Sequence, residues 1–146
     1  MGVVLMELKP ELKRMAKDID ILFDTWLKVP EDSRDRLYEA MRHAAIGGGK
    51  RIRPMLVLAA SKLFNVDHDS AMRAGFAVEC IHVYSLVHDD LPCMDDDDLR
   101  RGKPTVHKAF DEATAVLAGD CLLALALEIL GEAATHRDPC VCAELV

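Results

Sequence analysis

The first half of the chain places apolar residues at the spacing of amphipathic helices. From about residue 8 to residue 28 they recur every three or four positions, with lysines and aspartates between them: Leu12, Met15, Ile19, Leu22, Phe23 and Trp26. This period predicts a helix that buries one face. Pro30 should end it. A second periodic run, from about Ser33 to Ile46, should stop at Gly47-Gly48-Gly49, because glycine is costly inside a helix.

Two more helices are predicted between Pro54 and Leu91. Pro54 suits the first turn of a helix that continues to Leu63. Asp69-Ser70 can cap the next helix, which runs toward Leu91. Pro92 should then break the helical conformation.

The second half begins with a loop and continues with a long apolar helix. Charged residues and Gly-Lys-Pro indicate a loop from Asp95 to Pro104, and the apolar run covers about residues 112 to 134. Residues 143–146 resemble the start of another helix. No strand pattern or internal repeat is evident, so we predict an all-α bundle of about five to six helices.

Composition and charge narrow the possible functions. The 146 residues fit one domain, and 51% hydrophobic residues are enough for a core. The net charge of −7 argues against bulk attraction to nucleic acid or to an anionic membrane. Any anionic ligand must therefore be held by local cations.

The cysteines and the apolar segments bear on location. Five cysteines without a CxxC pair suggest neither a disulfide framework nor a zinc site, which favours a reducing, cytoplasmic location. The first residues do not form a signal peptide. The apolar run from Ala115 to Leu130 contains Asp120 and Glu128, and we expect it to be too short and too charged to cross a bilayer.

An acidic segment is the clearest chemical signal. Six of the ten residues from Asp89 to Asp98 are aspartate. A solvated acidic loop is one explanation. A calcium loop starting at Asp95 is excluded, because Arg100 and Val106 occupy the positions that require Gly and Glu.

Magnesium suits this segment better than calcium. It binds one or two carboxylates and completes its shell with water and phosphate oxygens. The bend at Pro92 could bring Asp89 and Asp95 together, and Arg100-Arg101-Gly102-Lys103 follows with charges that attract phosphate. The residues alone leave two alternatives, a metal–diphosphate site and a salt-bridged surface loop.

A second basic cluster lies at the predicted start of the third helix. The segment Gly47–Pro54 combines three glycines and three cations with the free N–H groups of a helix start. Its spacing does not fit a Walker A loop. By itself this signal is weak, since basic residues at a helix start usually face solvent.

Together, three segments closely resemble the trans-type prenyl diphosphate synthase family, particularly its bacterial farnesyl type. They are GGGKRIRP, ECIHVYSLVHDDLPCMDDDDLRRGKPTVHKAF and AVLAGDCLL, and the match extends over most of residues 40 to 130. The resemblance implies a helical bundle of the isoprenoid synthase type, usually a homodimer. It also implies magnesium-dependent condensation of isopentenyl diphosphate with an allylic diphosphate.

The resemblance also implies roles for particular residues. Asp89 and Asp95 would bind magnesium ions that hold the allylic diphosphate, with Asp90 in support, and Arg100 would grip that diphosphate. Four residues would bind the diphosphate of isopentenyl diphosphate: Lys50, Arg53, His82 and Arg101. From the residues alone, a histidine on an apolar helix is more often a core residue than a ligand.

Tyr84 bears on product length. It precedes Asp89 by five residues, where the family's large aromatic side chains close the floor of the prenyl pocket. This implies farnesyl diphosphate (C15) as the product, with geranylgeranyl or longer products as the alternative. A simple core role for Tyr84 remains open.

The sequence departs from the family in length. The family's second aspartate-rich motif has no counterpart here, so residues 1–146 would form the N-terminal part of a single polyprenyl synthase domain, inactive by itself. Leu122, Leu125 and Ile129 are then expected to lack cover and to promote oligomerisation. A non-catalytic partner subunit is the competing hypothesis. A terpene cyclase is disfavoured, because it does not need the second basic cluster.

Overall fold

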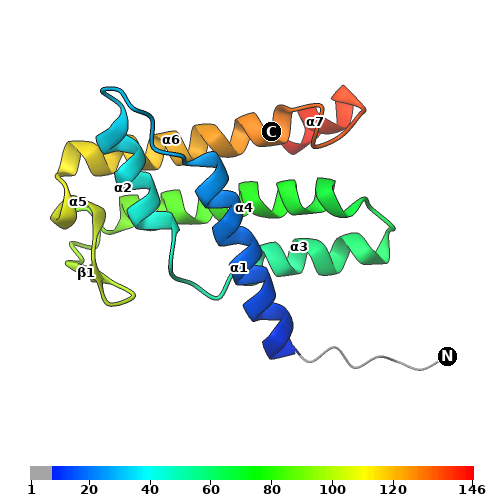
Figure 1. The fold of residues 1–146 in the computed structure, drawn as a ribbon, viewed down its shortest axis with the longest axis horizontal. Coiled ribbons are helices and arrows are strands. Elements are labelled where there is room, and N and C mark those ends of the chain that lie inside the picture. Colours follow the sequence, from blue (N-terminus) through cyan, green and yellow to red (C-terminus); the bar gives the residue numbers. More distant parts are fainter. Residues whose placement is uncertain (1–7) are drawn as a thin grey trace.

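A computed structural model describes residues 8–146, which form seven helices and one short hairpin (Figure 1). The elements in chain order are α1 Leu8–Trp26, α2 Asp35–Ala45, α3 Ile52–Leu63, α4 His68–Asp89, β1 Leu99–Arg100, β2 Lys103–Pro104, α5 Val106–Ala109, α6 Glu112–Gly131 and α7 Pro139–Leu145. The all-α prediction is confirmed. The count exceeds five to six because α5 and α7 are short.

Helices α4 and α6 lie side by side along the long axis, and α3 packs against α4 (Figure 1). Helix α1 crosses this pair, and the rings of Phe23 and Phe76 meet edge to face with centroids 4.7 Å apart. On α6, Leu122 and Ile129 are fully buried. The expectation that they lack cover is therefore wrong, because α4 already covers this face.

Helix boundaries follow the local capping chemistry. Helix α4 is capped by Asp67, whose carboxylate accepts from the Ser70 backbone N–H at 3.0 Å, so the prediction of an Asp69-Ser70 cap is two residues too late. Asp111 caps α6 by accepting from the N–H of Thr114 at 2.7 Å. Helix α6 ends at Gly131, three residues before the predicted end.

The predicted loop from 95 to 104 contains an antiparallel pair of two-residue strands, which corrects the expectation of no strands. Leu99 pairs with Pro104 and Arg100 with Lys103. Both residues of the turn, Arg101 and Gly102, have positive φ angles of 54° and 79°, as tight hairpins require. Strands of two residues are too short to produce an alternating pattern in the sequence.

Helix α6 is long and apolar enough to cross a membrane by length and composition. This corrects the expectation that the apolar run is too short and too charged, because the helix extends beyond that run at both ends. Its contacts with α4 give another reason for its apolar character, since seven of its residues are buried in the described part of the chain.

Candidate functional site

The two basic clusters of the sequence meet at the end of the bundle where α4 stops. The glycine loop before α3 lies against the hairpin, and Lys103 Nζ donates to the Ile46 carbonyl at 3.2 Å. Gly49 has a φ of +99°, and a Cβ at this position would lie 2.8 Å from Arg101 Nη1. The glycines therefore let the Arg101 guanidinium lie directly on the loop backbone.

Arg51 holds this loop in place through its buried side chain. Its side chain is buried, and its guanidinium donates to Glu79 at 2.8 Å, to Asp20 at 2.7 Å and to the Ala45 carbonyl. Its backbone is left-handed, with φ of 49°. The sequence placed Arg51 among the cations of the candidate phosphate cluster and did not predict its burial, because a basic residue at a helix start is usually exposed and nothing local predicts a buried ion pair.

Arg53, His82 and Arg101 lie close to Arg51. The pKa of His82 is lowered by burial and by the nearby charge of Arg53, with Arg101 adding to the effect. The pKa of Arg101 is lowered by burial and by Arg51. His82 is therefore neutral at pH 7, in a region where an anion would relieve the mutual repulsion of the arginines. Arg53 and Arg101 thus lie near enough to His82 to act on its charge, and their joint binding of a diphosphate stays a prediction.

The acidic segment divides into paired and unpaired carboxylates. Asp90 is buried and accepts two hydrogen bonds from Arg100 Nε, at 2.7 and 2.9 Å, while Arg100 Nη2 lies 2.6 Å from the same carboxylate. Arg100 also approaches Asp97 at 3.5 Å. The Arg100 guanidinium thus lies beside the acidic segment, held largely by Asp90, and its role toward a diphosphate stays a prediction.

Asp89 and Asp95 are brought together by the backbone. The N–H of Asp95 donates to the carbonyl of Asp89 at 2.8 Å, so the chain closes on itself after the helix end. Within the described residues, neither carboxylate takes part in a salt bridge or side-chain hydrogen bond. Carboxylates free of protein partners, on residues that the backbone joins, fit magnesium, which uses few protein ligands and keeps several waters.

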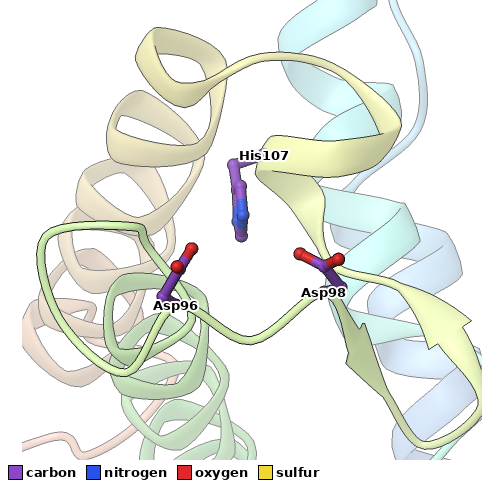
Figure 2. A group of neighbouring side chains, drawn as sticks. All are labelled: Asp96, Asp98 and His107. Atoms are coloured by element: carbon purple, nitrogen blue, oxygen red, sulfur yellow. The ribbon is translucent and has the colours of Figure 1, made fainter.

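A further acidic group was not foreseen from the sequence. Asp96, Asp98 and His107 each offer one ligand atom, and these atoms lie within 4.8 Å of one another. Figure 2 shows the imidazole ring of His107 directed toward the space between the two aspartates. The PTVH segment carried no metal signal by spacing, because the hairpin fold brings His107 back to the acidic loop.

Tyr84 lies on α4, one turn before His88. The two rings meet edge to face with centroids 4.8 Å apart, and Tyr84 is half-buried against the core. This contact fits a core role for Tyr84. Its role as the floor of the prenyl pocket stays a prediction.

The sequence of the chain matches a known protein family and several of its members. A family model described as polyprenyl synthetase matches residues 34–145. The chloroplastic geranylgeranyl pyrophosphate synthase of Capsicum annuum is 62% identical over 92 residues, which are 63% of this chain and 25% of that protein. The farnesyl diphosphate synthase of Haemophilus influenzae is 48% identical over 120 residues, which are 82% of this chain and 41% of that protein.

A solved structure shares the fold closely. The crystal structure of an FPP/GFPP synthase from Zymomonas mobilis matches with a TM-score of 0.91 and 66% identity, covering 94% of this chain and 49% of that one. The chain therefore spans less than half the length of each of these three relatives.

Proposed function

The chain belongs to the polyprenyl synthetase family, and from this premise we propose that it carries one wall of the active site of a magnesium-dependent prenyltransferase. The transferase would join isopentenyl diphosphate to an allylic diphosphate. The observation that supports this best is the presence of two sets of groups, one acidic and one basic, along the C-terminal part of α4 and the segments beside it. Asp95 is bound to Asp89 through the backbone, and Arg53 and Arg101 lie near neutral His82.

The two sets correspond to two diphosphate sites. His82 precedes Asp89 by seven residues, or two helical turns, which separates them by about 10.5 Å along the axis at ~1.5 Å per residue. This is a reasonable distance between two adjoining substrates. We assign Lys50, Arg53, His82 and Arg101 to isopentenyl diphosphate, and Arg100 to the allylic diphosphate.

Each group would contribute electrostatically. Neutral His82 can donate one hydrogen bond to a phosphate oxygen, and the arginines can bind such oxygens with paired N–H groups. Magnesium held by Asp89 and Asp95 would neutralise the charge that grows on the departing diphosphate.

The proposed reaction needs no nucleophile from the protein. The allylic carbon–oxygen bond breaks and its electron pair leaves with the diphosphate. The isopentenyl double bond attacks the allylic cation to form the new carbon–carbon bond. A proton is then lost from the adjacent carbon, and the released diphosphate is its acceptor. We assign no step to the five cysteines.

We propose farnesyl diphosphate as the main product of the whole protein, with Tyr84 limiting chain growth. The relatives support a geranylgeranyl product equally well, because they include synthases of both kinds. A homodimer and a cytoplasmic location are also proposals. They rest on the family resemblance and on the cysteine usage.

Binding tests this proposal better than turnover, because the relatives are more than twice as long. We expect calorimetry to show that the chain binds geranyl diphosphate with magnesium and more weakly without it. Asp89→Asn and Asp95→Asn should each lower the affinity by about tenfold or more, because each removes a metal ligand. The control Asp69→Asn removes an exposed charge from the far end of α4 and should bind normally. Equal binding by all three variants would refute the proposed site.

A further inference from the structure

We propose that Asp96, Asp98 and His107 form a binding site for a divalent transition metal ion. The three residues come from the acidic loop, the start of the hairpin and α5 (Figure 2). They share no residue with the Asp89 and Asp95 pair assigned above to magnesium.

The imidazole of His107 carries the argument. His107 is only 8% exposed, and its Nε2 is buried with no hydrogen-bond partner among the described residues. A buried polar nitrogen without a partner is unfavourable, so an unpaired Nε2 on a ring directed between two carboxylates points to a missing ligand.

The hydrogen bonds around His107 fix which nitrogen can bind a metal. Nδ1 lies 3.2 Å from Thr105 Oγ1, and the Thr105 hydroxyl donates its one proton to the Asp97 carbonyl at 2.8 Å. Oγ1 must then accept from Nδ1–H, which assigns the proton of neutral His107 to Nδ1. Nε2 therefore carries the lone pair that a metal would bind, and the hydrogen bond at Nδ1 orients the ring, as is usual for histidines that bind metals.

The carboxylates are placed to complete the site. Asp98 accepts from Lys108 Nζ at 2.8 Å through Oδ1, which leaves Oδ2 available. Asp96 is exposed and adopts a left-handed backbone with φ of 53°. Ligand atoms on one zinc ion lie about 3.4 Å apart at ~2.1 Å from the metal, so modest rotation of the exposed aspartates would close the site.

One imidazole and two carboxylates select the kind of metal. Imidazole suits zinc, copper, iron and nickel, whereas magnesium prefers oxygen ligands and retains its waters. An ion here would tie the acidic loop to α5 and so fix the hairpin that carries Arg100 and Arg101. A protonated His107 paired with an aspartate is the competing explanation, and it predicts no metal binding.

Zinc titration of the chain by calorimetry, in excess magnesium to occupy oxygen-only sites, tests the proposal. We expect one zinc ion per chain. His107→Asn retains a donor near the Nδ1 position but lacks Nε2, and it should weaken zinc binding by about tenfold or more. Asp96→Asn should do the same, since asparagine tolerates the left-handed backbone.

Asp97→Asn is the matched control, because it removes the same charge from the same loop without touching the cluster. It should keep zinc affinity within about threefold of the starting chain, as a change outside the ligand set should. Cobalt absorption in the visible range should show a nitrogen ligand that is lost in His107→Asn. Absence of zinc binding, or equal zinc binding by Asp96→Asn, would overturn the proposal even if His107→Asn fails to fold.

Discussion

At the scale of single residues, the site depends on a buried arginine that touches no proposed substrate position. Arg51 joins three carbonyl or carboxylate groups from α1, α2 and α4, and its guanidinium also lies over the Phe23 ring at 5.3 Å. A buried charge is tolerated when partners of opposite charge surround it. Removing one partner leaves the remaining charge buried and uncompensated, which lowers stability. The buried contacts of Arg51 therefore fix the shape of the glycine loop.

We expect Arg51→Met to lower the free energy of unfolding by about 3–5 kcal/mol, because it leaves Glu79 buried without a partner. Urea denaturation followed by circular dichroism measures the loss. The control Arg34→Met breaks the exposed pair with Asp32 and should leave the midpoint nearly unchanged. An unchanged midpoint for Arg51→Met would show that this ion pair does not anchor the loop.

His82 gives a prediction for pH. Its pKa is lowered in the folded chain by burial and by Arg53, so the unfolded chain takes up the proton more readily. Folding stability should therefore fall as the pH drops from about 6.5, the usual value, through the lower folded pKa. His82→Gln should remove this part of the pH dependence, measured by urea denaturation between pH 7.5 and pH 5.

The exposed His68 at the start of α4 provides the control, since His68→Gln should keep the decline. A histidine pKa for His82 at or above the usual value, measured by NMR titration, would contradict the charge arrangement described for the basic cluster.

At the scale of elements, the packing of α4 against α6 depends on a glycine, Gly119, at the contact between the two helices. A Cβ at Gly119 would lie 2.2 Å from Nε2 of His88, and the same nitrogen lies 3.0 Å from the carbonyl of Val116. The imidazole thus sits directly on the α6 backbone. The last turn of α4 leads into Asp89, so this contact also positions the start of the acidic segment.

Gly119→Ala should destabilise the chain by about 1–3 kcal/mol, because the added methyl group displaces His88 from the helix interface. Gly131→Ala, at the end of the same helix, has no atom within 4 Å of the added Cβ. It should be neutral or stabilise by up to about 1 kcal/mol. Equal thermal midpoints for the two variants would contradict the close contact between His88 and Gly119.

At the scale of the whole molecule, the exposed apolar surface lies elsewhere than the sequence suggested. Leu122 and Ile129 are buried, whereas Leu63 and Phe64 at the end of α3 are 79% and 77% exposed. Leu56 and Leu117 are also more than half exposed. Large apolar side chains exposed on a surface favour association.

We expect the chain to associate with a second copy through the end of α3, in a concentration-dependent manner. Analytical ultracentrifugation should show that Leu63→Ser and Phe64→Ser increase the monomer fraction, because they remove exposed apolar area. Met94→Ser removes an exposed apolar side chain from the acidic loop after α4 and should not increase the monomer fraction. A monomer at every concentration would refute the expectation.

The sequence by itself determined the helices, the family and the two charged clusters. Helical periodicity, proline and glycine act over a few residues, so α1 to α4 and α6 were predicted within a few residues of their ends. The Asp89 and Asp95 pair and the basic residues around Lys50 are also visible as local motifs.

Only the tertiary structure decided which of these charges are free and which are paired. Asp90 is bound to Arg100, Arg51 is buried on Glu79, and His107 returns to the acidic loop. The hairpin that carries Arg100 has strands of two residues, too short for any periodic signal. Pairing between distant segments depends on how α4, α6 and the hairpin pack, which residue spacing along the chain does not encode.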